Sequence, residues 1–326
     1  MIILTGGAGF IGSAFLAKLN EAGADDILVV DDLSPSEGAE KWRNLNGKRF
    51  RDYLHKDQFA ELLDSNSLHG DVTAVVHLGA CSSTTETDAE YMLQNNYRYT
   101  KMVAEWSIAR GVRFIYASSA ATYGDGAKGF SDSLDELDRF RPLNVYALSK
   151  QLFDRWALQT GAFAHAVGLR FFNVYGPNEY HKGDMRSVVH KSFEQINATG
   201  SVKLFKSYRP EYGDGEQVRD FVYVRDCSDV MWWLLENPSI TGLYNLGTGT
   251  ARSWNALAQA VFGALGKAPS IEYIDMPEAL RPKYQYLTEA KMDSLRNAGC
   301  PIAFRSLEQG VSEYVQGFLM TENPYL

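Results

Sequence analysis

Residues 2–12 read Ile2-Ile3-Leu4-Thr5-Gly6-Gly7-Ala8-Gly9-Phe10-Ile11-Gly12, an apolar run followed by closely spaced glycines. The apolar run predicts a buried strand, and the helically spaced apolar residues after the glycines predict a helix. The motif Gly7-x-Gly9-x-x-Gly12 at such a turn is typical of a dinucleotide site, because glycine lets a pyrophosphate approach the backbone and lets the helix pack on the strand. A turn that binds nothing is the alternative.

A second apolar run ends at Asp31, nineteen residues after Gly12. A carboxylate at this spacing is placed to accept hydrogen bonds from the adenosine ribose of a dinucleotide. Asp31 and Asp32 favour NAD, whereas Lys41 and Lys56 would favour the 2′-phosphate of NADP, unless these lysines are simply solvated. The sequence therefore predicts a nicotinamide dinucleotide and leaves the choice between NAD and NADP open.

The composition limits the class of protein. The chain has 326 residues, 45% hydrophobic content and a formal net charge of −8. Nothing in this charge indicates a nucleic acid or an anionic membrane as a partner. Cys81, Cys227 and Cys300 are too widely spaced for a disulfide framework or a metal cluster, which indicates a reducing compartment. No stretch approaches the roughly 18 apolar residues that span a bilayer. We therefore expect a cytoplasmic protein without a metal site.

Strand and helix patterns alternate over residues 1–175, which predicts an α/β fold with a Rossmann-type, doubly wound parallel sheet. One of the strands is expected over 167–175. The pattern then loosens, so residues 176–326 are expected to form mainly a smaller, irregular substrate lobe, with later segments free to rejoin the sheet. A cleft between the two parts is the expected place for a small substrate. His77, inside an apolar strand, is expected to be a hydrogen-bonded core residue.

Three residues suggest a reaction. Ser119 ends a strand predicted over 112–119, and ligands of open α/β sheets bind beyond the carboxyl ends of the strands. Tyr146 and Lys150 begin a predicted helix four residues apart, so they share one face. A tyrosine pKa of about 10 falls when nearby positive charge favours the phenolate. Beside Lys150 and an oxidised nicotinamide, Tyr146 could then take a proton from an alcohol that Ser119 holds. An ordinary amphipathic helix is the alternative.

Several stretches carry a resemblance to a known family. The glycine-rich turn, Ser119, and Tyr146 with Lys150 resemble the extended short-chain dehydrogenase/reductases, over essentially the whole chain. Other runs are similar to those of the nucleotide-sugar epimerases that act on an ADP-heptose. The most specific of these are Gly79-Ala80-Cys81-Ser82-Ser83-Thr84-Thr85-Glu86 and His181-Lys182-Gly183, and the more widely shared ones are Asn95-Asn96-Tyr97, Phe172-Asn173-Val174-Tyr175-Gly176-Pro177 and Arg219-Asp220-Phe221-Val222-Tyr223-Val224.

The resemblance implies epimerisation at C6 of ADP-D-glycero-D-manno-heptose, by transient hydride transfer to a tightly bound cofactor, in the synthesis of lipopolysaccharide core precursors. It also implies a homo-oligomer, a pentamer in particular. An epimerase needs an acid/base for each epimer, and the resemblance gives these roles to Tyr146 and Lys182. With the glycine turn, the residues expected near the cofactor are Gly6, Gly9, Phe10, Ile11, Gly12, Asp31, Asp32, Lys41, Lys56, Leu78, Gly79, Ala80, Cys81, Ser82, Asn95, Tyr146, Lys150, Val174 and Lys182. Those expected near the substrate are Asn173, Asp184, Phe205, Lys206, Ser207, Tyr208, Arg219 and Tyr284.

Two other classes of protein remain open. Another nucleotide-sugar epimerase or a 4,6-dehydratase would share the fold. A dehydratase, however, needs an Asp-Glu pair after the serine, where this chain has Ala120 and Ala121, and a 4-epimerase would not need Lys182. A non-catalytic, NAD(P)-binding regulator would be expected to lack the tyrosine or the lysine of the predicted pair, and both are present here.

Overall fold

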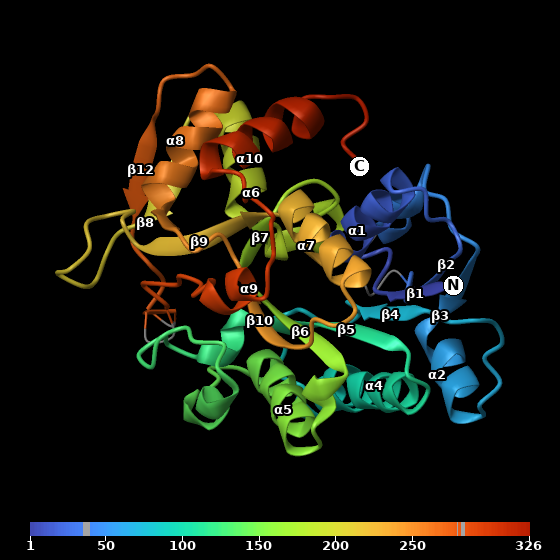
Figure 1. Cartoon of the computed structure of the whole chain (residues 1–326). Helices are drawn as coiled ribbons and strands as arrows, with labels where there is room; N and C mark the ends of the chain where they lie inside the picture. Colours follow the sequence, from blue (N-terminus) through green and yellow to red (C-terminus); the bar gives the residue numbers. More distant parts are fainter. Residues whose placement is uncertain (35–39, 279, 282–283) are drawn as a thin grey trace.

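The computed structural model describes residues 1–34, 40–278, 280–281 and 284–326, and within them seven parallel strands form the central sheet (Figure 1). Their order is β10-β6-β5-β4-β1-β2-β3. Because β1 pairs with both β2 and β4, the order runs outward from β1 in both directions, and the predicted doubly wound fold is confirmed. The bounds are β1 Ile2–Thr5, β2 Ile27–Asp31, β3 Asp52–His55, β4 Ala74–His77, β5 Arg113–Ser119, β6 Ala166–Phe171 and β10 Gly242–Leu246.

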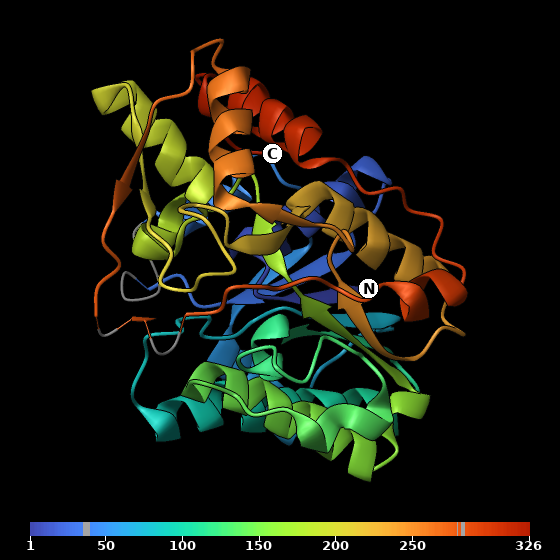
Figure 2. The same cartoon turned by 90° about the vertical axis from the view of Figure 1, so that its left-hand side faces the viewer.

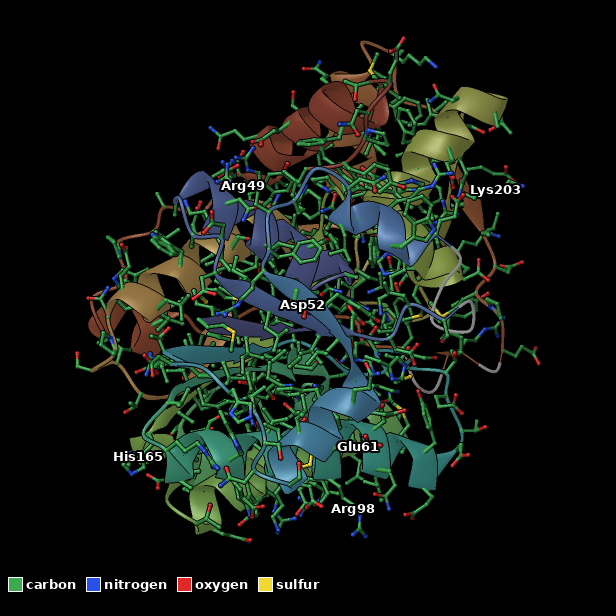
Figure 3. All side chains as sticks on the ribbon, turned by 90° about the vertical axis from the view of Figure 1, so that its right-hand side faces the viewer. Arg49, Asp52, Glu61, Arg98, His165 and Lys203 are labelled. Carbon is green, nitrogen blue, oxygen red and sulfur yellow. The ribbon has the colours of Figure 1, made fainter. Side chains whose placement is uncertain are left out.

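Helices cover both faces of this sheet (Figure 1). Successive side chains of a strand point to opposite faces, so Leu4 joins the core beneath α1 and α7, whereas Ile3 joins the core beneath α2, α4 and α5. β3 forms one edge of the sheet, and its first residue, Asp52, has an exposed carboxylate (Figure 3). Such charges keep an edge strand from pairing with other chains. The helix bounds are α1 Phe10–Glu21, α2 Lys56–Asp64, α3 Ala89–Met92, α4 Tyr99–Ala109, α5 Val145–Gln159, α7 Val224–Glu236 and α9 Asp293–Asn297.

A second lobe lies above the carboxyl end of the sheet (Figures 1 and 2). It contains the small sheet β11-β9-β7 and the pair β8 with β12, packed with α6, α8 and α10 around a core of its own. The chain returns from this lobe to the large sheet through α7 and β10. The division of the chain at residue 175 stays a prediction. The bounds are β7 Asn173–Tyr175, β8 Val202–Phe205, β9 Val218–Tyr223, β11 Ala251–Ser253, β12 Ile271–Ile274, α6 Val188–Thr199, α8 Trp254–Ala264 and α10 Leu307–Tyr314.

The strand expected over 167–175 is divided in the structure. β6 pairs with β5 and β10 in the large sheet, whereas β7 pairs with β9 in the second lobe. The prediction of one strand was wrong because both pieces are apolar, and composition does not reveal a change of partner. The change falls at Phe172, whose N–H donates to the carbonyl of Leu246. At this point one residue carries the chain from one lobe to the other.

The helix expected over residues 87–110 is present, but its middle is wound as a π-helix, η3, over Leu93–Arg98. Such wide turns frequently occur at functional sites. The loop expected over 178–184 contains a 3₁₀ turn, η7 Tyr180–Met185. The remaining short helical turns are η2 Lys41–Leu45, η4 Ala120–Tyr123, η5 Leu134–Arg139, η6 Ala162–Ala164 and η9 Val315–Leu319.

His77 is a satisfied core residue, as predicted. Its two ring nitrogens lie 2.7 Å from Thr5 Oγ1 and 2.9 Å from Thr100 Oγ1. Burial lowers the pKa of His77 to about 3, and the charge of Lys150 acts in the same direction. The ring is therefore neutral and structural. None of the helices in the described ranges has the length and apolar character to cross a bilayer.

Candidate active site

A cavity of about 890 Å³ lies at the carboxyl ends of β1, β2, β4 and β5 and extends to the 180–185 turn of the second lobe. The structure brings most of the predicted cofactor residues together around it. His181 and Met185, which are not among the predicted cofactor or substrate residues, also line it. The predicted residues in the lining are Gly6, Gly9, Phe10, Ile11, Gly12, Asp31, Asp32, Lys41, Lys56, Leu78, Gly79, Ala80, Cys81, Ser82, Asn95, Tyr146, Lys150 and Lys182.

The glycine turn forms one wall of this cavity. Gly6 has φ +70°, and its N–H donates to the carbonyl of Val30 on the neighbouring strand. A Cβ on Gly12 would lie 2.0 Å from the Gly6 carbonyl oxygen. The turn is thus folded so tightly that α1 begins at the cavity wall, where a helix N-terminus can bind phosphate.

Replacing Gly12 with alanine is expected to reduce the affinity for the dinucleotide and to destabilise the fold by about 1–3 kcal/mol, because the turn must open to relieve the clash. Gly263 in α8 is the matched control, because a Cβ there meets nothing within 4 Å among the described residues. Its alanine variant should be neutral or more stable by up to about 1 kcal/mol. Urea unfolding and titration with NAD measure both effects. Equal stability of the two variants would contradict the close packing of the turn.

Asp31 connects β2 to the glycine turn. Its Oδ2 accepts a hydrogen bond from Ala8 N–H (2.8 Å), and its Oδ1 accepts from Asp32 N–H and Lys41 Nζ (both 2.7 Å). The carboxylate is buried. Asp31 therefore shapes the turn and also neutralises Lys41 at the end of the cavity where an adenosine would lie.

Asp32 is anionic at neutral pH. Burial alone would raise its pKa, but hydrogen bonds from Ser34 and the charges of Lys56 and His55 outweigh burial and lower the pKa to about 2. Lys56 Nζ lies 3.6 Å from Asp32 Oδ2 and donates to Asn95 Oδ1 at 3.0 Å. Each of the two lysines predicted at this end of the cavity therefore has a carboxylate partner.

The predicted trio comes together at the end of β5. Ser119 lies beside the Tyr146 phenol, whose pKa it lowers, and its Oγ accepts from Ala121 N–H at 3.1 Å. Lys150 is almost fully buried, and its Nζ donates to the carbonyl of Ala117 at 2.9 Å. These contacts fix the phenol and the ammonium beside the same strand end.

Burial acts on both ionisable groups of the trio. It raises the pKa of Tyr146, which the hydrogen bond from Ser119 partly offsets. It lowers the pKa of Lys150 to about 8, against the opposing effects of Asp154 and Cys81. Because burial opposes formation of the phenolate, a base at Tyr146 requires additional positive charge, such as an oxidised nicotinamide.

A buried polar network that the sequence analysis missed supports this trio. Asp154 lies one turn after Lys150 on α5 and accepts from Arg170 Nη2 (2.9 Å), Tyr116 OH (2.8 Å) and Ser118 Oγ (2.9 Å). Asp154 and Arg170 are both 0% exposed. The network joins α5 to β5 and β6, and it thereby sets the position of the helix that carries Tyr146.

Asn96, in the π-helix η3, is a second residue that the site prediction omitted. Its side chain accepts from Cys81 N–H and donates to the Cys81 carbonyl, both at 2.9 Å. It also donates to Ser149 Oγ at 3.2 Å. Asn96 therefore connects the loop after β4 to α5, although it does not itself line the cavity that the described residues form.

Lys182 reaches the cavity from the second lobe. Its N–H donates to the Glu179 carbonyl, and its Nζ lies 5.6 Å from the centre of the Phe10 ring. Burial lowers the pKa of Lys182, and the charge of Glu179 opposes the shift. Burial, with the charges of Lys41 and Lys182, also lowers the pKa of His181 to about 4. The histidine is therefore neutral beside this lysine.

The predicted substrate residues lie mainly in the second lobe, beyond the lining of the 890 Å³ cavity. The Arg219 guanidinium lies 5.2 Å from the centre of the Tyr284 ring, and Tyr284 packs edge-on against Phe205 at 6.4 Å. Tyr208 and Lys206 both contact Asp275, and Ser207 N–H donates to Asp214. Their roles toward a substrate stay predictions.

The other predicted residues are more scattered. Asn173 Oδ1 accepts from Thr288 Oγ1 at 3.3 Å, and the exposed Asp184 accepts from Lys191 through its main-chain carbonyl. Val174 packs against a small apolar cluster formed by Phe10, Ala14 and Val224.

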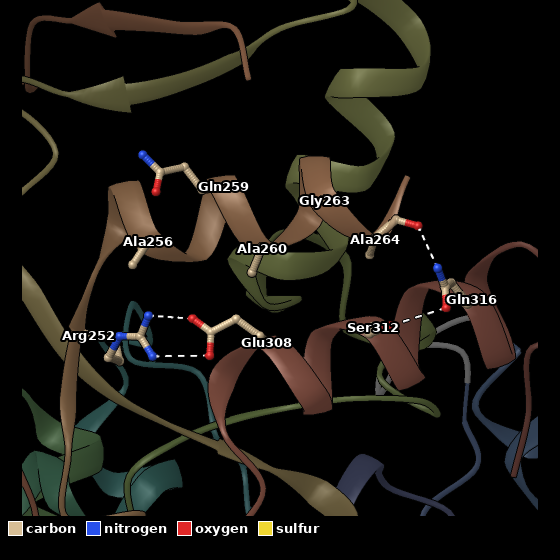
Figure 4. A pocket seen from close by; sticks show the side chains of 9 residues that line it. All are labelled: Arg252, Ala256, Gln259, Ala260, Gly263, Ala264, Glu308, Ser312 and Gln316. Carbon is tan, nitrogen blue, oxygen red and sulfur yellow. Dashed lines mark hydrogen bonds and ion pairs between the residues drawn. The ribbon is translucent and has the colours of Figure 1, made fainter. Parts of the chain in front are cut away.

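A second hollow, of about 400 Å³, lies between α8 and α10 (Figure 4). Ala256, Ala260 and Gly263 form one side of it, and an ion pair between Arg252 and Glu308 closes one end. None of the predicted site residues is among those that line it.

Comparison with known proteins identifies the class to which this fold and site belong. The pattern of the NAD dependent epimerase/dehydratase family matches residues 2–247, and the chain belongs to this family. Among its relatives are the ADP-L-glycero-D-manno-heptose-6-epimerases of Nitratidesulfovibrio vulgaris (strain DP4), 57% identical over 100% of both chains, and of Fusobacterium nucleatum, 47% identical over 100% of both.

Solved structures agree with this assignment. The ADP-L-glycero-D-manno-heptose-6-epimerase of Helicobacter pylori is 28% identical, with a TM-score of 0.82 over 97% of this chain and 95% of that one. The UDP-glucose 4-epimerase of Thermus thermophilus, in complex with NAD, is 27% identical, with a TM-score of 0.73 over 97% of each chain.

Proposed function

We propose that the protein interconverts ADP-D-glycero-D-manno-heptose and ADP-L-glycero-D-manno-heptose by epimerisation at C6. The relatives that share its full length support the substrate. The observation that carries the proposal is that Tyr146, on α5 beside the large sheet, and Lys182, from the second lobe, line the same cavity. Two acid/bases on different elements suit a reaction in which the C6 oxygen changes sides.

The cavity fits a nicotinamide dinucleotide, because one of its walls is the glycine turn. This turn is so tight that a Cβ on Gly12 would clash with the Gly6 carbonyl oxygen. The turn and the start of α1 would hold the pyrophosphate, and Asp32 would face the adenosine. Lys150 would reach the nicotinamide ribose. When bound, the cofactor supplies a hydride acceptor that can return the hydride to the other face of C6.

The chain's own residues move the protons. Ser119 holds the C6 oxygen of one epimer, and Tyr146 takes its proton as general base. Lys150 stabilises the phenolate through its positive charge. Lys182 is the acid/base for the other epimer, whose oxygen lies on the opposite side. Burial lowers the pKa of Lys182, which increases the fraction of the neutral amine that can accept a proton.

The direct test is to incubate the purified protein with ADP-D-glycero-D-manno-heptose and to determine the C6 configuration by NMR. Conversion to an equilibrium mixture is expected. An unchanged C6 configuration would contradict the proposal. Inversion of UDP-glucose at C4 instead would favour the 4-epimerase alternative, and binding of NAD(P) without turnover of either sugar would favour a regulator. A homo-oligomer, a pentamer in particular, stays a prediction that light scattering can test.

We propose NAD as the preferred cofactor, because Asp31 and Asp32 already pair with Lys41 and Lys56 and leave little positive charge for a 2′-phosphate. Replacing Asp32 with asparagine should raise the affinity for NADP relative to NAD by on the order of tenfold, since it frees Lys56 and removes a repulsion. Asp52, an exposed carboxylate on the adjacent strand, is the matched control (Figure 3).

Fluorescence titration of each variant with NAD, NADP and 2′,5′-ADP measures the selectivity without requiring turnover. The Asp52→Asn variant should retain the wild-type ratio of the affinities. A wild-type preference for NADP would reject NAD as the preferred cofactor. An unchanged ratio in the Asp32→Asn variant would show that Asp32 does not determine the preference.

A further inference from the structure

The chain that follows η9 returns to the active-site side of the molecule and reaches α1 (Figure 1). We refer to residues 324–326 as the tail. The Leu326 side chain packs in the small apolar cluster of Phe10, Ala14 and Val224. Lys48 Nζ donates to the main-chain oxygen of Leu326. The tail is therefore a packed part of the structure beside the wall of the cavity.

Every residue of the tail contacts the segment that leads to Lys182. Leu326 N–H donates to Asn178 Oδ1 at 3.0 Å. The Tyr325 ring packs edge-on against the Tyr180 ring, with centroids 5.2 Å apart, and Tyr180 OH donates to the Pro324 carbonyl at 2.5 Å. The tail thus holds this segment at two of its residues, both shortly before Lys182.

The position of the segment 178–182 depends on the tail through Asn178, which accepts the hydrogen bond from Leu326 N–H. Asn178 has φ +76°, in the left-handed region that asparagine adopts more readily than other non-glycine residues. It is fully buried, and its Nδ2 donates to Ser13 Oγ at 2.9 Å, while its carbonyl accepts from Asn44 at 3.0 Å. Loss of the Leu326 donor would leave its buried Oδ1 without that hydrogen bond, which is costly.

The tail and Lys182 also share a neighbour. Phe10 lines the cavity, belongs to the apolar cluster on which Leu326 packs, and lies beneath the Lys182 ammonium at 5.6 Å. A shift of the tail would therefore alter both the backbone that leads to Lys182 and the ring on which its charge rests.

We propose that Tyr325 and Leu326 are positioning residues that hold Lys182 in place at the cavity. This inference rests on the proposed function, in which Lys182 serves one of the two epimers. It predicts an asymmetric effect. Loosening the tail impairs the half-reaction that depends on Lys182 and spares the half-reaction that depends on Tyr146, which is held from α5 and β5.

The test uses Tyr325→Ala and Tyr180→Phe, the second of which removes only a hydroxyl and should preserve the fold. Met320→Ala, an exposed residue that precedes the tail, is the matched control. Hydrogen exchange of residues 178–186 in each full-length protein, loaded with its cofactor, measures the coupling between tail and segment. Faster exchange is expected in the two tail-contact variants and wild-type exchange in the control.

The second measurement is the single-turnover reduction of the bound cofactor by each ADP-heptose epimer separately. In the tail-contact variants the rate should fall about 10- to 100-fold with one epimer, as for a misplaced catalytic group, and should stay near wild type with the other. Equal slowing with both epimers, or unchanged exchange of residues 178–186, would overturn the inference. A wild-type protein that epimerises neither sugar would refute the proposed function instead, and the exchange measurement would still decide whether the tail holds the segment.

Discussion

Replacing Tyr146 with phenylalanine is expected to reduce kcat for epimerisation roughly 10²- to 10⁴-fold, the range for loss of a general acid/base. The affinity for the dinucleotide should stay near wild type, because Lys150 keeps its hydrogen bond to Ala117 and the glycine turn is untouched. NMR of the product and a titration with NAD measure the two effects separately.

Tyr244→Phe is the matched control for this change, because it also removes one phenolic hydroxyl, on β10, where that hydroxyl donates to the Thr241 carbonyl. Its turnover should match the wild type. If Tyr146→Phe loses its cofactor while Tyr244→Phe does not, Tyr146 acts in binding and its role as a base is wrong. Retention of full activity by Tyr146→Phe would have the same consequence for the mechanism.

Replacing Asp154 with alanine is expected to lower the free energy of unfolding by about 3–5 kcal/mol, because it leaves the buried Arg170 charge without its partner. Arg170 is fully buried and donates through both Nε and Nη2 to Asp154. Tyr116 and Ser118 would also lose their acceptor. Urea unfolding measures the loss.

The double variant Asp154→Leu, Arg170→Met separates charge from packing. It should recover most of the lost stability, since removing both charges together avoids the unpaired guanidinium. If Asp154→Ala unfolds at the wild-type urea concentration, the network does not stabilise the junction of α5 with the sheet. Recovery of stability without recovery of turnover would indicate that the network also sets the position of Tyr146 and Lys150.

Local sequence signals predicted the parts of the site that a short stretch determines. The turn from Gly6 to Gly12 combines strand, glycines and helix within one run, and Tyr146 and Lys150 are four residues apart on one helix. Lys182 lies in a loop of the other lobe, so its approach to Phe10 depends on tertiary structure. No spacing rule reveals such an approach, and only the family resemblance pointed to it.

The residues that the site prediction missed act through long-range contacts. The partners of Asp154 lie on two strands, and Asn96 contacts Cys81 and Ser149, 15 and 53 residues away. The sequence alone does not show whether a polar residue in a mainly apolar helix is buried in a hydrogen-bond network or exposed to solvent. The division at Phe172 is hidden for a related reason, since both strands that it separates are apolar.

The wide turn of η3 lets two consecutive asparagines serve different neighbours. Asn95 accepts from Lys56 at the adenosine end, whereas Asn96 holds the loop at Cys81. Deleting one residue between 93 and 98 would close the wide turn to ordinary α-helical winding, and the segment would then have one residue fewer to contact Lys56 and Cys81. We therefore expect the segment 93–98 to tolerate substitution more readily than deletion, so related sequences should rarely differ in length here.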